Sequence, residues 1–158
     1  MSEDRSEAVD TETIRLERSV DTAREELWLW FTASEKTAQW IGPWHFTDKE
    51  RGRIGLQLVA EEGAPASAAT IWRCEPPSLL ELTTEDAAGS WHLRVSLAES
   101  GVRGEATRLV FEHFEVPVAM ISDIRAGWNY YLDLMLAAKD GLETPVFEDY
   151  LEAPAEEA

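Results

Sequence analysis

The longest amphipathic pattern in the chain lies between Pro117 and Asp140. Its apolar residues recur at steps of three and four, the spacing of one face of an α-helix; they are Ile121, Ile124, Trp128, Tyr131 and Met135. Proline suits a first helical turn, and a glycine, here Gly141, suits the residue just past the end. Gly127 in the interior costs roughly 1 kcal/mol relative to alanine, so we expect another segment to pack close to the helix backbone there. The pattern predicts one long helix over residues 117–140.

Upstream of this helix, apolar and polar residues alternate in short runs that are typical of β-strands. The runs cover residues 14–20, 53–59, 68–75, 80–84, 91–97 and 107–114. Two helices are expected after the first strand, over residues 22–32 with Asp21 or Thr22 as N-cap, and over residues 34–40. Short strands joined by turns pair antiparallel. The chain therefore predicts an α+β fold of order β-α-α-β-β-β-β-β-α, an antiparallel sheet with the long helix across it.

One face of these strands and of the helix is apolar and should point inward. Strand phase and helix face give this set: Leu56, Leu58, Trp72, Leu82, Trp91, Leu93, Phe111, His113, Ile124, Trp128 and Tyr131. Trp40 joins them as a candidate in the loop 40–46, which either forms the mouth of a pocket or is packed down. The set either lines a cavity for a small apolar ligand or fills a core in which indole rings pack together. The pattern leaves both readings open.

Residues that carry chemistry are sparse. His113 lies among apolar neighbours, where it is either a hydrogen-bonding or general-base group or a structural histidine. His92 is out of phase with Trp91 and is expected to face solvent. The three histidines have no zinc-binding spacing, and no nucleotide-binding or nucleophile motif occurs. We therefore predict no catalytic residue, no metal and no cofactor, and interpret Cys74 as a buried small hydrophobe.

Charge narrows the classes of partner. The chain has 14 basic and 31 acidic residues, a net charge of −17, which argues against nucleic acid or an anionic membrane as partner. Much of the excess lies in residues 1–12 and 143–158, which we expect to be acidic tails around a domain over residues 13–142. The second tail either docks on a domain through its aromatic residues or stays disordered. We favour partial docking, because Phe147 and Tyr150 are costly to leave in water. No run is long enough to span a bilayer, and a single cysteine favours a reducing, cytoplasmic location.

A series of short motifs occurs in order along residues 13–142. They are Gln39-Trp40-Ile41-Gly42-Pro43, Gly52-Arg53-Ile54, Glu75-Pro76-Pro77-Ser78-Leu79-Leu80, Thr107-Arg108-Leu109, Glu112-His113 and Ala126-Gly127-Trp128. Together they resemble the START/Bet v 1-like (SRPBCC, helix-grip) superfamily, in the branch related to the activator of Hsp90 ATPase. The resemblance implies a curved antiparallel sheet wrapped around the long C-terminal helix, with a cavity between them. Members of the superfamily bind lipids, sterols, polyketides and other hydrophobic molecules, and some are cyclases or hydrolases.

These observations favour a non-catalytic module that binds a small hydrophobic ligand between sheet and helix. One alternative is a co-chaperone-like interaction with a protein partner or a second copy of the chain, through the sheet surface or the loop 40–46. Another is a cyclase- or hydrolase-type enzyme that uses the same cavity, with His113 or Tyr131 as acid or base.

Overall fold

The computed structural model describes residues 10–57, 66–86, 89–147 and 150. Its elements follow the order β1 (Thr11–Val20), α2 (Arg24–Thr32), α3 (Ser34–Thr37), β2 (Trp44–Asp48), η1 (Lys49–Arg51), β3 (Arg53–Gln57), β4 (Ala66–Glu75), β5 (Leu79–Asp86), β6 (Gly89–Ser100), β7 (Ala106–Pro117), η2 (Val118–Met120) and α4 (Ile121–Asp140). The strands form one seven-stranded antiparallel sheet in the order β1-β7-β6-β5-β4-β3-β2. The predicted α+β class and the long C-terminal helix are confirmed.

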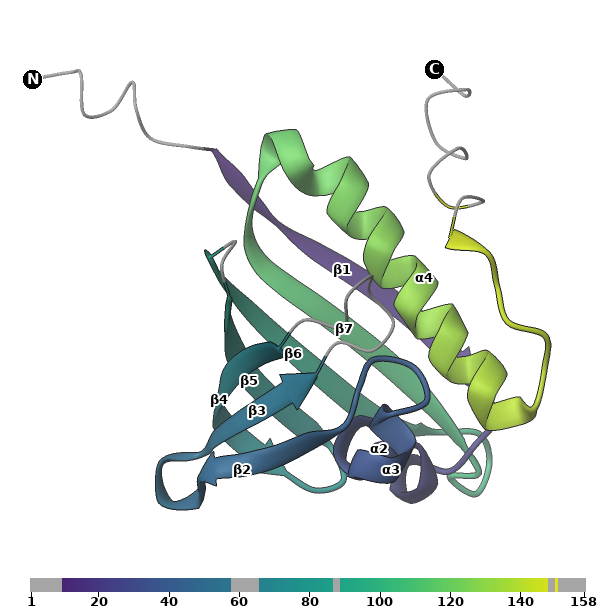
Figure 1. Ribbon diagram of the computed structural model, residues 1–158. Coiled ribbons are helices and arrows are strands. Elements are labelled where there is room, and N and C mark those ends of the chain that lie inside the picture. Colours follow the sequence, from purple (N-terminus) through teal and green to yellow (C-terminus); the bar gives the residue numbers. More distant parts are fainter. Residues whose placement is uncertain (1–9, 58–65, 87–88, 148–149, 151–158) are drawn as a thin grey trace, which may run out of the picture.

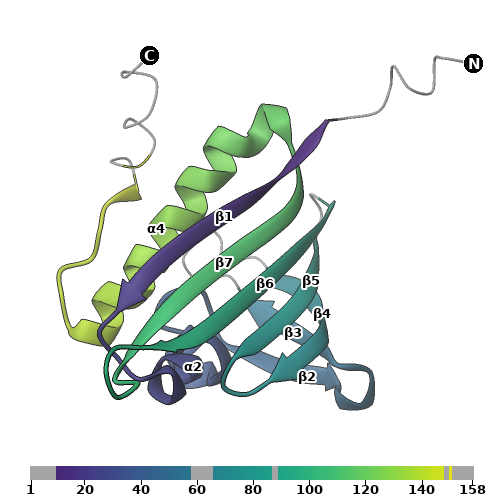
Figure 2. The same cartoon turned by 180° about the vertical axis from the view of Figure 1, so that it is seen from behind.

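The sheet is strongly curved, and α4 lies diagonally across its concave side (Figure 1). Seen from behind, β1, β7, β6 and β5 form the outer surface of this curved sheet (Figure 2). At one end, α2 packs on β6 and β7 while α3 packs on β2. The core therefore lies between the concave face and α4, and its fully buried side chains include Leu27, Leu97, Leu109, Leu132 and Met135.

One strand was not predicted. We interpreted residues 40–46 as a loop, whereas Trp44–Asp48 form the edge strand β2. Trp44 lies opposite Leu56 and Phe46 lies opposite Ile54 on β3. Most side chains of this edge strand are exposed, so buried and exposed residues do not alternate along it and its sequence does not predict a strand. Its pairing with β3 fixes its extended backbone.

Two predicted helix starts are wrong. The N-cap of α2 is Ala23, without a side-chain cap, because Thr22 has other partners. Its hydroxyl accepts a hydrogen bond from Lys139 Nζ at 2.7 Å, and its carbonyl accepts one from Thr107 Oγ1 at 2.6 Å. Pro117 ends β7 and does not open the helix, which begins at Ile121 after the turn η2.

The helix end at Gly141 is confirmed, with φ of 68°, but the expected close approach at Gly127 is wrong. A Cβ atom at Gly127 would meet no atom within 4 Å outside its own helix backbone. The close approach occurs at Gly52 instead, where φ is 70° and a Cβ would lie 2.7 Å from the carbonyl oxygen of Ile71.

Gly52→Ala is expected to lower the free energy of unfolding by about 1–3 kcal/mol, because a left-handed backbone costs an L-residue roughly 1–2 kcal/mol and the contact with Ile71 adds to this. Gly141→Ala is the matched control, since φ is 68° there but nothing lies within 4 Å of the added atom. Urea unfolding of both variants measures the difference. Equal losses would mean that the contact with Ile71 has no energetic effect.

Candidate functional site

A cavity of about 210 Å³ lies between the sheet and α4, at the end that α2 and α3 close. Its described wall is almost entirely apolar and consists of Phe31, Thr32, Thr37, Trp40, Ile41, Trp44, Phe46, Ile54, Leu56, Ile71, Cys74, Leu80, Leu82, Val95, Phe111, Trp128 and Leu132. An engineered cavity of about 150 Å³ admits benzene, and drug-sized ligands occupy sites of about 300 Å³ or more. The volume of this cavity lies between these two values and suits a compact molecule of one or two rings.

The hydroxyl and indole donors of the wall are already bonded. Trp40, Trp44, Thr37 and Thr32 donate to the backbone carbonyls of Trp30, Thr32, Ser34 and Trp28 at 2.8–3.2 Å. The indole of Trp128 donates instead to the side chain of His113 at 3.1 Å. The described part of the wall holds no carboxylate and no imidazole. A ligand would therefore be selected by shape and by apolar contact, which is non-directional.

Trp128 is the centre of an aromatic cluster at this cavity. Its side chain is 7 % exposed. Its ring centroid lies 4.4 Å from that of Phe111, 5.7 Å from Tyr131 and 6.1 Å from Trp91. Tyr131 also lies 6.4 Å from Trp40. These edge-on and tilted contacts between α4 and the sheet fix one end of the cavity.

His113 lies behind Trp128 and outside the described cavity wall. Its side chain is 2 % exposed, and its Nδ1 accepts a hydrogen bond from Trp128 Nε1 at 3.1 Å. Burial lowers the pKa of His113 to about 4, with a smaller contribution from the charge of His92. The imidazole is therefore neutral at pH 7, with its proton on Nε2. This is the arrangement of a structural histidine that orients an indole.

The structure brings only part of the predicted set together. Five predicted residues line the cavity: Trp40, Leu56, Leu82, Phe111 and Trp128. Five others lie in the surrounding core: Trp91, Leu93, His113, Ile124 and Tyr131. Leu58 lies outside the described residues.

Trp72 was predicted to point inward, and this is wrong. Its side chain is 64 % exposed, and its Nε1 donates to Thr83 Oγ1 at 3.0 Å on the outer face. A register shift in β4 between Ile71 and Arg73 adds a residue to the strand. Ile71 and Cys74 line the cavity in its place, because a bulge changes the side on which the following residues project.

The prediction that Cys74 is buried is also wrong, because its side chain is exposed. It lies in the cavity wall, where partial burial raises the pKa of its thiol. A raised pKa keeps the group protonated and weakly nucleophilic at neutral pH. Its position gives it a wall-forming role and no catalytic activation.

The outer face of the sheet carries a closed network of charges. Glu112 is buried on that face and accepts hydrogen bonds from Arg94 at 3.0 Å and Arg15 at 3.4 Å. Glu17 pairs with Arg108 at 2.7 Å, and its pKa is lowered chiefly by this hydrogen bond and next by the one from Arg15. Each carboxylate here has its cations, so the network is structural.

His92 projects to this outer face, as its phase predicted, but it is half-buried and not free in solvent. Its Nε2 lies 2.5 Å from Glu81 Oε2, and its ring lies 4.7 Å from that of Phe114. Within the described residues, no three His, Cys, Asp or Glu side chains gather closely enough to hold a metal ion. Nor does any helix of the described chain have the length and apolar character that crossing a bilayer requires.

Comparison with known proteins identifies one family and several similar folds. The family model described as "Activator of Hsp90 ATPase homolog 1-like protein" matches residues 21–138. Among solved structures, CalU16 from Micromonospora echinospora has a TM-score of 0.70 at 23 % identity, covering 91 % of this chain and 86 % of CalU16. The protein encoded by gene BPP1335 from Bordetella parapertussis has a TM-score of 0.72 at 25 % identity, covering 94 % of this chain and 85 % of that one.

DynU16, from the dynemicin biosynthetic locus, has a TM-score of 0.68 at 18 % identity. The match covers 87 % of this chain and 51 % of DynU16, so this chain spans about half the length of that protein. No curated protein matches the chain. At such identities, the similarity to CalU16 and DynU16 shows a shared fold.

Proposed function

Because the chain belongs to the family of activator of Hsp90 ATPase homolog 1-like proteins, we propose that it is a non-catalytic binding protein whose cavity between the sheet and α4 holds a small hydrophobic molecule. The observation that carries this proposal is the cavity of about 210 Å³ with its apolar wall. Since the hydroxyl and indole donors of the described wall are already bonded within the protein, a charged or strongly hydrogen-bonding ligand would lose its hydration without compensation. The ligand class is therefore compact, uncharged and largely apolar.

The similarity to DynU16 supports a small molecule over a macromolecule as ligand. That protein is described as part of a biosynthetic locus, a setting in which small molecules are made.

The test is a titration with toluene, cyclohexane and decalin, which do not emit where tryptophan does, read by tryptophan emission, because Trp40, Trp44 and Trp128 line the cavity. We expect saturable binding of at least one of these probes. Val95→Phe, which adds a ring to the cavity wall, should weaken that binding at least about tenfold, equivalent to about 1.4 kcal/mol.

Val110→Phe is the matched control, because it makes the same change on β7 at a position between the inward-facing Leu109 and Phe111. It should leave affinity unchanged, and circular dichroism should show both variants folded. Binding that is unaffected by Val95→Phe, or no binding of any probe, would contradict the proposal.

A second function, protein interaction, draws support from the description of the family and from Trp72. An indole that is 64 % exposed on a sheet face is a residue type enriched at binding hot spots. Two variants distinguish these functions. Val95→Phe alters the cavity and should affect only ligand binding, whereas Trp72→Ser alters the outer face and should affect only protein binding.

A cyclase- or hydrolase-type reaction has less support. It needs two polar groups within hydrogen-bond reach of one ligand. His113 and Tyr131, the candidates for acid and base, both lie outside the described cavity wall.

A further inference from the structure

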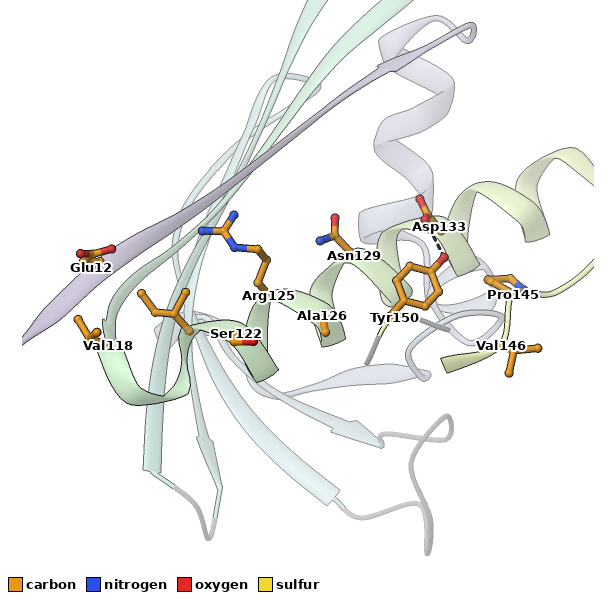
Figure 3. Close-up of a pocket in the computed structure, with 11 residues that line it drawn as sticks. Glu12, Val118, Ser122, Arg125, Ala126, Asn129, Asp133, Pro145, Val146 and Tyr150 are labelled. Carbon is orange, nitrogen blue, oxygen red and sulfur yellow. Dashed lines mark hydrogen bonds between the residues drawn. The ribbon is translucent and has the colours of Figure 1, made fainter. Parts of the chain in front are cut away.

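A second hollow lies on the outer side of α4 and shares no described lining residue with the cavity (Figure 3). It has a volume of about 790 Å³, within the range of about 300–1,000 Å³ that is usual for ligand sites. Its walls come from the first part of α4, the start of β1, and residues 145, 146 and 150. We refer to it as the α4 groove.

The wall on the C-terminal side is held against α4 by aromatic contacts, as the aromatic residues of that segment led us to expect. The ring centroids of Phe147 and Tyr150 lie 5.2 Å and 5.7 Å from that of Tyr130. The hydroxyl of Tyr150 donates to Asp133 at 2.7 Å (Figure 3). The α4 groove is therefore built by packed side chains and is not a gap beside a loose segment.

Among the described residues that line this groove, Arg125 is a cation without an ion-pair partner. Its neighbours along α4, Asn129 and Asp133, both accept hydrogen bonds from Arg18, at 2.8 Å and 3.3 Å. Among the described residues, no ion pair, hydrogen bond or ring contact involves the Arg125 side chain. Every other described lysine or arginine has such a partner except Arg103 in the turn after β6.

The remaining wall near Arg125 is apolar and partly open to water. Val118 is 46 % exposed and Val146 is 52 % exposed, and Ile121 and Ala126 also line the groove. We propose that the α4 groove binds an amphiphile with one apolar chain and an anionic head, the head paired with Arg125 and the chain covering these side chains. This chemistry is shared by fatty acids and by single-chain phosphates.

The carboxylates of the groove do not occupy the place of the anion. Asp133 is already engaged by Arg18 and Tyr150. Glu12 lies on β1 beside Val118, whereas Arg125 projects from α4 farther along the groove (Figure 3). No ion pair joins Glu12 to Arg125 in the described structure, so the guanidinium is available to pair with an anionic head group. The carboxylate of Glu12, at one end of the groove, repels such an anion.

The test is a titration of the ¹⁵N-labelled full chain with decanoate, decyl phosphate and decanol, followed by amide chemical shifts. We expect decanoate to shift the amides of Val118, Arg125 and Val146 saturably. Arg125→Gln should weaken decanoate binding about fivefold, the effect of one exposed ion pair, while Arg125→Lys keeps most of the affinity. Glu12→Gln is the matched opposite change and should strengthen binding.

Decanol should bind with an affinity that Arg125→Gln does not alter. If Arg125→Gln weakens the binding of decyl phosphate as it weakens that of decanoate, the groove binds any anionic head group. If decyl phosphate does not bind, the groove is specific for carboxylates. Decanoate shifts confined to cavity residues such as Val95, a decanoate affinity unchanged by Arg125→Gln, or binding of an apolar peptide but not decanoate would each overturn the inference. Val95→Phe should leave the groove titration unchanged, so this result is independent of the proposed cavity ligand.

Discussion

Replacing Trp128 by alanine is expected to lower the free energy of unfolding by about 3–5 kcal/mol, the usual cost of deleting a buried aromatic side chain. The substitution removes ring contacts with Phe111, Tyr131 and Trp91. It also removes the indole N–H that donates to His113 Nδ1, which leaves a buried acceptor without its partner. Urea unfolding followed by circular dichroism measures the loss.

Trp72→Ala is the matched control for this experiment. The same side chain is deleted, but its indole is 64 % exposed and its hydrogen bond to Thr83 lies on the outer face. We expect a loss of no more than about 1 kcal/mol, the net value of one hydrogen bond. Similar losses for the two variants would contradict the inward position of Trp128 and the outward position of Trp72.

The stability of the protein is expected to fall as the pH falls from 6.5 towards 4, because of His113. The pKa of its imidazole is about 4 in the folded chain, against an ordinary value of 6.5. Above pH 6.5 the group is neutral in both states and has no effect. Below it the unfolded chain takes up a proton that the folded chain does not, so unfolding becomes more favourable, by roughly 3 kcal/mol in total near pH 4.

Urea unfolding of the wild type and of His113→Gln at pH 7, 6 and 5 tests this expectation. The variant should be less stable at pH 7 but should lose less stability between pH 7 and 5. His92→Gln, which removes a neighbouring imidazole on the outer face, should keep most of the wild-type slope. The pKa of Glu17 and of Glu105 is lowered from 4.5, so their stabilising effect is lost only as the pH falls towards and below 4.5, under the measured range of pH 7 to 5. If the wild type and His113→Gln lose the same amount of stability between pH 7 and 5, His113 is not the cause of the loss.

Regular periodicity made most of the fold predictable from sequence. The helix over residues 121–140 repeats its apolar residues over several turns, and strand β6 alternates cleanly, with Leu93, Val95 and Leu97 buried. These patterns report the local side-chain directions of regular elements, and they need no knowledge of the partner element. They also predicted that Phe111 on the sheet and Trp128 on α4 point inward, and the ring centroids of these two residues lie 4.4 Å apart.

The errors have a different origin, since each depends on how one element contacts another, which the pattern within a single element does not show. The bulge that turns Trp72 outward is a property of the β4–β5 pair, and the edge strand β2 exists through its bonds to β3. Likewise, no pattern along α4 could show that Trp128 donates to His113 and leaves the imidazole outside the cavity wall. The α4 groove joins segments from both ends of the chain, so only the folded arrangement reveals it.

The bulge in β4 has a consequence for spectroscopy. By turning the strand after Ile71, it places Cys74 in the cavity wall, and this is the one cysteine of the chain. A thiol-specific fluorophore or spin label would therefore attach at a single, known position beside the site of the proposed ligand, without any prior mutagenesis. Since the pKa of the thiol is raised, coupling should proceed faster at mildly alkaline pH than at neutral pH. Exclusion of the reagent by a saturating ligand would then serve as a direct assay of cavity occupancy.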